Sequence, residues 1–424
     1  MVITTETELT QLINRLGNET AYVYPVAVDA FLHPAENKLS SLHFLFDDGT
    51  SYTVSANHPD APHFTIDISH AYKLVTLYQK ELKQLITTGD VIDLATMVHM
   101  NGVEIPTYRD YYTMMIRQIK NQFKFKNLHY SIPLTSWVET AEAFLQLTKS
   151  LYQQYQETEY TDAFSFINQI TISTLTDIEN AGLWTTDNKL VYSDYNIYTS
   201  TGRPSNAFGG INFAALNKND GTREKFVSRF GENGTLVQFD YEGFHLRLAA
   251  KLIGYTLPEV SVHEFLAKQY YGTDEITEEM YEESKARTFG LMYGYSDDVG
   301  GVEFFGKLKG YSSDLWELYR QNGFVLSQTG RKVTVVDPNQ SKVFNYLMQL
   351  TETEEAISRV HDVCEFLKLG QTKVILYTYD AILLDVPTDE LNRMENVGTI
   401  LSAGGYPVRQ YRGTNYNNLI LHKI

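Results

Sequence analysis

The chain has 424 residues, a formal net charge of −17 and one cysteine. This length accommodates two or three domains, and 43% hydrophobic residues indicate a folded protein with a large core. No apolar run approaches the roughly 18 residues of a membrane span, and residues 1–30 do not read as a secretion signal. The lone Cys364 excludes an internal disulfide framework. We therefore expect a cytoplasmic protein, in the host cytoplasm if it is viral.

The acidic charge argues against a simple nucleic-acid-binding domain, because such domains are usually basic. A cleft can nevertheless concentrate positive potential on an acidic protein. Composition alone therefore leaves nucleic-acid binding open.

The first part of the chain, residues 1–125, reads as a small α/β unit. Apolar residues alternate between positions 21 and 54, with Asp48-Gly49 as a hairpin signal, and helical spacing follows from 71 to 85. Ser136 and Glu139 then form a capping-box pattern that opens a largely helical stretch over 131–185. From residue 186 onward, strand and helix signals mix.

One candidate site residue, Asp240, ends the apolar run Leu236–Tyr241 and is followed at once by an amphipathic helix. This pattern places the carboxylate at an exposed strand end, where a charge can meet a ligand without the full cost of burial. By itself the pattern is common in turns of α/β proteins.

A second aspartate, Asp380, lies between the apolar segments 374–379 and 382–386, which predicts a tight hairpin with Asp380 at its turn. Alone, it would be an ordinary turn residue. Beside Asp240 on a neighbouring strand, it would complete a site of hard oxygen ligands, which magnesium prefers.

A helix face carries the third pattern, since Tyr281, Lys285, Phe289 and Tyr293 recur every four residues. The lysine could meet the phosphates of a nucleoside triphosphate, while the rings pack on its sugar and base. The alternative is a core helix whose lysine extends its amine to the surface.

The order and spacing of these segments resemble family A DNA polymerases, the DNA polymerase I type of bacteria and many bacteriophages. Asp240 to Arg247 resembles motif A, Lys285 to Gly294 matches the K-x-x-x-F-G-x-x-Y-G pattern of motif B, and Tyr379-Asp380-Ala381 lies where motif C has H-D-E. Weaker matches fall between them in the family's order: Thr201-Gly202-Arg203, Thr329-Gly330-Arg331 and Asn345-x-x-x-Gln349-x-Thr351.

The resemblance implies a mixed α/β, right-hand polymerase with palm, fingers and a short thumb, preceded by an α/β domain like a degenerate 3′–5′ exonuclease. The expected boundaries are 1–125 for the exonuclease-like domain, 126–185 for the thumb-like helices, 186–250 for the first palm part, 251–330 for the fingers and 331–424 for the second palm part.

The resemblance also implies roles for individual residues. Asp240, Asp380 and the Tyr241 backbone carbonyl would hold two Mg²⁺ ions, for which Mn²⁺ can substitute. The nucleotide would contact Tyr241, His245, Lys285, Phe289 and Tyr293. DNA would contact Arg203, Arg247, Arg331, Asn345 and Gln349. The expected partners of this monomer are primer–template DNA, dNTPs and, because the thumb is short, a processivity or replisome partner.

Several positions depart from the family pattern. His245 replaces a glutamate that packs against the sugar and rejects ribose, and Tyr281 replaces an arginine that contacts phosphates. Motif C has lost its histidine and glutamate to Tyr379 and Ala381. In the exonuclease-like domain only Asp29 and Asp93 match expected metal ligands, so we expect that domain to be inactive.

Two other functions compete with a DNA polymerase acting in replication. One is a nucleotidyltransferase with relaxed choice between ribose and deoxyribose, although related RNA polymerases usually carry methionine where Phe289 stands. The other is a polymerase-like, DNA-binding replisome scaffold, which would explain the eroded motifs and the acidic charge. A scaffold would not explain why Asp240, Lys285 and Asp380 remain together.

Overall fold

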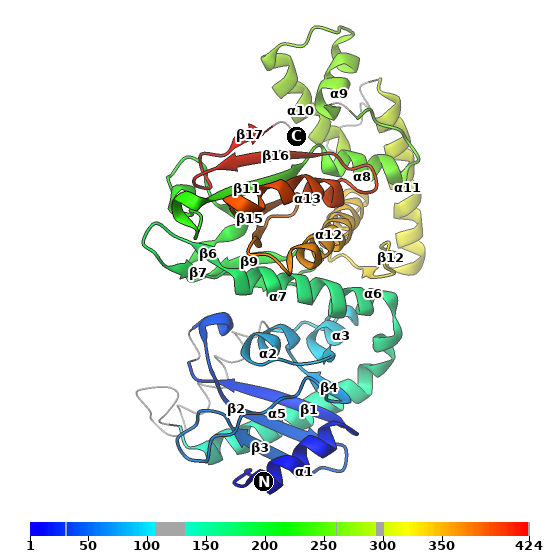
Figure 1. The fold of residues 1–424 in the computed structure, drawn as a ribbon. Coiled ribbons are helices and arrows are strands. Elements are labelled where there is room, and N and C mark those ends of the chain that lie inside the picture. The colour runs from blue at the N-terminus through cyan, green and yellow to red at the C-terminus, as the bar shows by residue number, and fades with distance from the viewer. Residues whose placement is uncertain (30–31, 107–131, 260, 294–300, 423–424) are drawn as a thin grey trace. The chain divides into compact units, whose positions relative to one another are not determined.

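The computed structural model describes residues 1–29, 32–106, 132–259, 261–293 and 301–422 (Figure 1). The chain divides into two compact units, Met1–Thr176 and Asp177–Ile424. Among the described residues, no helix combines the length and the apolar character needed to cross a membrane.

The first unit is built on a five-stranded sheet in the order β3-β2-β1-β4-β5. Strands β1 to β3 pair antiparallel, whereas β4 pairs parallel with β1 and β5 parallel with β4. The strands are β1 (Thr20–Ala27), β2 (Leu39–Phe46), β3 (Ser51–Ser55), β4 (Lys73–Thr76) and β5 (Val91–Asp93). The helices are α1 (Glu6–Leu16), α2 (Gln79–Leu85), α3 (Leu94–Met100), α5 (Leu134–Tyr155), α6 (Asp162–Ser165) and α7 (Ile172–Ala181), the last of which continues into the second unit.

Helix α5 packs against β1 and β2 of this sheet. The Tyr24 and Phe144 rings lie 4.5 Å apart, and the Tyr22 and Tyr152 rings 6.0 Å apart. The apolar side of the helix therefore covers the sheet of the first unit. The domain boundaries expected from the sequence, after residues 125 and 185, differ from the division of the structure into two units after Thr176. A helical pattern in the sequence does not reveal which sheet the helix covers. The thumb role of this region stays a prediction.

The two acidic residues singled out in this unit occupy different places. Asp29 follows β1, and its backbone N–H donates to Asn37 Oδ1 at 3.0 Å. Asp93 ends β5, is fully buried, and accepts 2.7 Å hydrogen bonds from the backbone N–H groups of Gln79 and Thr96. Its carboxylate thus caps α3, a structural task. The absence of exonuclease activity stays a prediction.

The second unit contains a five-stranded antiparallel sheet in the order β14-β15-β11-β16-β17. Its strands are β11 (Gly234–Tyr241), β14 (Lys373–Tyr377), β15 (Ala381–Pro387), β16 (Val408–Gly413) and β17 (Ile420–His422). Five shorter strands lie outside this sheet and form a pair, β6-β7, and a three-stranded sheet, β10-β9-β8. Their bounds are β6 (Leu183–Trp184), β7 (Leu190–Val191), β8 (Tyr195–Asn196), β9 (Ser205–Phe208) and β10 (Ile211–Asn212). A further small hairpin joins β12 (Val325–Leu326) to β13 (Lys332–Val333).

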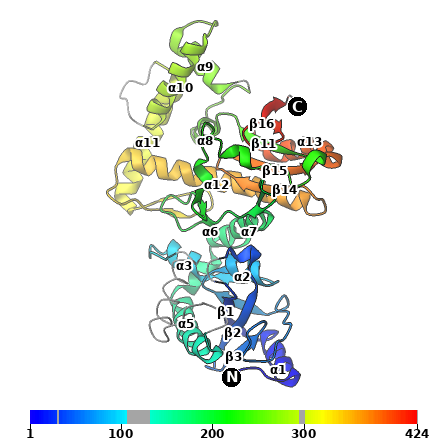
Figure 2. The same ribbon diagram turned by 90° about the vertical axis from the view of Figure 1, so that its left-hand side faces the viewer.

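Helices surround this sheet in two groups. The long helix α12 contacts α8, α11, α13 and strand β14, whereas α9 and α10 pair with each other and extend beyond the sheet (Figures 1 and 2). Their bounds are α8 (Phe244–Leu252), α9 (Val262–Tyr271), α10 (Glu278–Met292), α11 (Glu303–Asn322), α12 (Gln340–Leu367) and α13 (Met394–Leu401). The central strand β11 thus leads directly into α8. The C-terminal end of β11 faces the α9–α10 pair.

An ion pair between a partly exposed arginine and a buried aspartate fixes the segment before β11 to strand β15. Asp385 on β15 has no exposed surface, and its Oδ2 accepts from Arg229 Nε at 2.7 Å. The same guanidinium donates to the carbonyls of Ala181 and Gly182, and Ser228 Oγ donates to Asp385 Oδ1 at 2.6 Å. These bonds hold the segment before β11 in place at the end of the strand far from Asp240.

Candidate functional site

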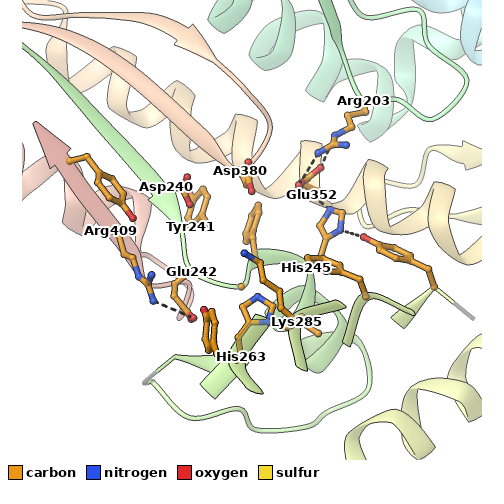
Figure 3. A pocket seen from close by; sticks show the side chains of 17 residues that line it. Arg203, Asp240, Tyr241, Glu242, His245, His263, Lys285, Glu352, Asp380 and Arg409 are labelled. Carbon is orange, nitrogen blue, oxygen red and sulfur yellow. Dashed lines mark hydrogen bonds and ion pairs between the residues drawn. The ribbon is translucent and has the colours of Figure 1, made fainter. Parts of the chain in front are cut away.

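A pocket of about 420 Å³ opens in the second unit at the end of β11 (Figure 3). Side chains reach it from β11, β16, helices α8, α9, α10 and α12, the β14–β15 turn and the segment before β9. It is lined by Arg203, Asp240, Tyr241, Glu242, Gly243, Phe244, His245, Leu246, His263, Tyr281, Lys285, Phe289, Tyr293, Glu352, Asp380, Arg409 and Tyr411. Asp240, Asp380 and the α10 face, which were inferred from separate patterns, therefore meet in one place.

Strand pairing brings the two aspartates together. Asp240 is opposite Ala381 in the β11–β15 register, and the Tyr241 N–H donates to the Asp380 carbonyl at 2.9 Å. The turn before Ala381 is tight, with Tyr379 in the left-handed region at φ 68°. The sequence prediction of a hairpin with Asp380 at its turn agrees with this geometry.

Burial and neighbouring carboxylates destabilise the ionised forms of both aspartates. Burial and the charge of Asp380 raise the pKa of Asp240 from 3.8 to about 6. Burial and the charge of Glu352 raise the pKa of Asp380. Within the described ranges, neither aspartate forms an ion pair with a basic side chain. A bound cation would remove this repulsion.

The donor set fits magnesium. No group of three or more His, Cys, Asp or Glu side chains in the described part of the chain could hold a metal by itself. Magnesium at phosphate groups is typically held by one or two carboxylates, with water and substrate oxygens completing its shell. Asp240 and Asp380, with the Tyr241 carbonyl beside them, could supply the protein ligands of such a site.

A buried glutamate that the sequence analysis did not identify joins the site. The Glu352 side chain is only 2% exposed, and its carboxylate lies 3.0 Å from Arg203 Nε and 2.9 Å from His245 Nε2. The other imidazole nitrogen, Nδ1, hydrogen-bonds the Tyr293 hydroxyl. The Arg203 guanidinium also lies 3.6 Å from the centre of the Tyr379 ring. Glu352 thus adds a third member to the contact between His245 and Tyr293.

The sequence contains a pattern that could have identified Glu352 as a buried, partnered charge. On α12 it shares an every-fourth-residue row with apolar, buried neighbours, namely Phe344, Met348, Ala356 and Val360. A charge within such a row must find a partner, because an unpaired buried charge is very unfavourable. The partners, Arg203 and His245, lie far away along the chain, so the pattern could not name them.

The predicted face of α10 lines the pocket with Tyr281, Lys285, Phe289 and Tyr293. Phe289 is 40% exposed although it is aromatic, which suits a surface that receives a ligand. His263, from α9, adds an imidazole whose ring centre is 5.9 Å from that of Phe289. Gly294, the last residue of the motif B pattern, lies outside the described residues.

Of the residues expected to contact DNA, some line the pocket and others lie outside it. Arg203 lines the pocket, whereas Arg331, Asn345 and Gln349 do not. Arg247 is only 7% exposed, and its guanidinium pairs with Glu242 at 2.7 Å. Arg247 thus secures the start of α8, and a DNA contact by this residue stays a prediction.

Three weakly matching sequence elements lie together at Gly202. This glycine has φ 72°, and a Cβ atom there would approach Leu350 Cδ1 to 2.5 Å and Arg331 Nη1 to 3.1 Å. Only glycine combines this conformation with such a close approach. The segment with Arg203, the segment with Arg331 and helix α12 are therefore packed against each other.

Comparisons with known proteins bear on the resemblance. No protein-family model matches the chain. A protein described as DNA polymerase I, from Caldicellulosiruptor bescii, is 25% identical in an alignment 238 residues long that covers 47% of this chain. The match takes in 28% of that relative, so the chain corresponds to less than a third of its length.

Similarity of fold extends over nearly the whole chain. A solved structure described as the POL domain of Pol1 from M. smegmatis, in complex with DNA primer-template and dNTP, matches with a TM-score of 0.73. The match covers 99% of this chain and 100% of the other, at 14% identity. Together the two similarities confirm the resemblance to family A DNA polymerases and the right-hand polymerase fold that it implied.

The raised pKa of Asp240 predicts an effect on stability. A carboxyl group whose pKa is higher in the folded state destabilises the fold once pH rises from about 4 through about 6. Without metal at pH 8, Asp240→Asn should therefore raise the free energy of unfolding by about 1–3 kcal/mol, and the gain should shrink toward pH 4. Urea unfolding in EDTA at both pH values measures this difference. The same change at exposed Asp389 serves as control, and a destabilised Asp240→Asn at pH 8 would contradict the account.

Proposed function

We propose that this chain, a relative of the family A DNA polymerases, is a template-directed DNA polymerase that extends a primer 3′-hydroxyl with dNTPs. The observation that carries the proposal is the meeting of Asp240 and Asp380 with Lys285, Phe289 and Tyr293 in one pocket. The solved polymerase domain of similar fold was described with primer-template and dNTP, ligands that we assign to this chain as well. DNA replication is the role that we propose for this activity.

In this proposal the carboxylates face the reacting phosphate. Asp240, Asp380 and the Tyr241 carbonyl would hold two Mg²⁺ ions, which would activate the primer hydroxyl and neutralise the leaving pyrophosphate. Lys285, on the facing helix, contributes a positive charge to the triphosphate. Most of the catalysis then comes from positioning and from charges oriented before the reaction begins.

The nucleotide base and sugar meet the aromatic end of the pocket. Phe289 and Tyr293 are nearly parallel, with an angle of 6° between their ring planes, so together they present flat surfaces to a ligand. In the structure His245 Nε2 lies 2.9 Å from Glu352 Oε1, an ion-pair distance, while Nδ1 hydrogen-bonds the Tyr293 hydroxyl. Glu352 thereby fixes the imidazole, and the imidazole fixes the phenol.

This network supports discrimination against ribose, which the loss of the motif A glutamate had put in question. His245 Nδ1 hydrogen-bonds Tyr293, and Nε2 is buried 2.9 Å from the Glu352 carboxylate, so neither nitrogen is open to a 2′-hydroxyl. A ribose hydroxyl placed against this ring would lose its bonds to water without replacement. The family carries a carboxylate in motif A. Here Glu352 supplies a carboxylate instead, and His245 lies between it and the place proposed for the sugar.

The first prediction from this proposal concerns Asp380. Asp380→Asn removes a metal-binding charge and should reduce primer extension with Mg²⁺ and dNTPs by at least about 1,000-fold, equivalent to about 4 kcal/mol of transition-state stabilisation. A labelled primer–template reports the extension, and Asp389→Asn provides the same chemical change on the surface. Extension by Asp380→Asn at the wild-type rate would refute the metal role.

A second prediction concerns sugar choice. His245→Ala opens the space beside Tyr293 and should reduce the preference for dNTPs over rNTPs by about tenfold or more, in line with the 1–3 kcal/mol expected for an unsatisfied buried polar group. The ratio of kcat/KM for a dNTP and the matching rNTP gives the preference. An unchanged ratio would exclude His245 from sugar selection.

The scaffold alternative makes an opposite prediction for the wild-type protein. If neither dNTPs nor rNTPs are incorporated at high enzyme concentration, with Mg²⁺ or with Mn²⁺, the pocket does not catalyse nucleotide transfer. DNA binding without extension would then favour the scaffold.

A further inference from the structure

Arg409 places a guanidinium at the rim of the pocket. It lies on β16, directly opposite Asp240 in the β11–β16 register, and its side chain is 44% exposed. The nearest acidic atom is Glu242 Oε1, 3.7 Å from Nη2, which is longer than a hydrogen bond. The guanidinium makes no hydrogen bond to any residue that the structure describes.

The other two arginines near the site are engaged. Arg203 pairs with Glu352 and lies over the Tyr379 ring. Arg247 pairs with Glu242 and donates to the Pro258 carbonyl. Because Glu242 also accepts from the Val262 N–H at 3.0 Å, its carboxylate is already well satisfied without Arg409. Arg409 is thus the arginine whose donors are available to a ligand.

Arg409 belongs to a cluster of basic groups on one side of the pocket. Lys285 from α10 and His263 from α9 line the same pocket (Figure 3). Burial lowers the pKa of His263; the charge of Glu242 opposes this shift, and the charges of Lys285 and Arg409 add to it. Two cationic side chains and one imidazole from separate elements therefore face one volume, with the two aspartates beside them.

Such an arrangement suits a polyanion that also binds metal ions. A nucleoside triphosphate carries charge along its whole phosphate chain, and one lysine meets it only as a point charge. Arginine can bind two phosphate oxygens at once through its planar guanidinium. The position at which the family carries a phosphate-binding arginine is occupied here by Tyr281, so a second cation must come from elsewhere.

We infer that Arg409, together with Lys285, binds the β- and γ-phosphates of the incoming nucleotide and supplies the positive charge missing at Tyr281. The inference rests on the proposed polymerase function and adds a binding residue to it. Attack of the primer hydroxyl on the α-phosphate releases the two outer phosphates as pyrophosphate. Arg409 therefore contacts the part of the nucleotide that leaves and stays near it until release.

The test is nucleotide binding without chemistry. A dideoxy-terminated primer on a template with 2-aminopurine as the next base reports binding of dTTP by fluorescence, in the presence of Mg²⁺. Arg409→Gln should raise the Kd for dTTP by about 10- to 100-fold, the range expected for charge-assisted hydrogen bonds. Arg409→Lys should recover part of this loss, because it restores the charge. The Kd for dTMP, which lacks both outer phosphates, should stay within about twofold of wild type.

Arg412→Gln is the matched control, because Arg412 lies on the same strand but does not line the pocket. It should bind dTTP within about twofold of wild type. The inference is overturned if Arg409→Gln binds dTTP like wild type, or weakens dTTP and dTMP by the same factor. In either case wild-type primer extension would leave the proposed function intact. A wild type that neither binds dTTP nor extends a primer would refute both.

Discussion

The repulsion between two adjacent carboxylates is the constraint on which the site depends. Antiparallel pairing of β11 with β15 places Asp240 beside the turn that carries Asp380, and burial leaves little water to screen their charges. Strand pairing therefore holds two like charges together at a cost to stability. A fold retains such an arrangement when a bound cation and its ligand reverse that cost.

The charged groups around these carboxylates differ between the two sides of the pocket. On the side of α12, the charges are satisfied internally, since Glu352 pairs with Arg203 and orients His245. On the side of β16 and α10, Arg409 and Lys285 remain available. The first side is rigid and suits recognition of shape, including the sugar. The second offers positive charge to phosphates, so an acidic protein can still bind a polyanion.

Sequence patterns predicted the parts of the site that are local in the chain. A strand ending in Asp240, a hairpin with Asp380 and a helix face with Lys285 each depend on periodicity or turn chemistry. The contacts of Glu352 and Arg409 depend on packing between elements far apart in sequence, which periodicity does not encode. The same limit applies to α5, which was expected to be helical although its place on the first sheet was not foreseen. The thumb-like role, the processivity or replisome partner and the monomeric state stay predictions.

The most direct test of the central claim is single-turnover incorporation of one nucleotide by wild-type protein on four primer–templates that differ only in the next template base. The account predicts that Mg²⁺ is required and that the incorporated dNTP follows the template base in all four cases. Incorporation that ignores the template, or no incorporation with enzyme in excess over DNA, would contradict it.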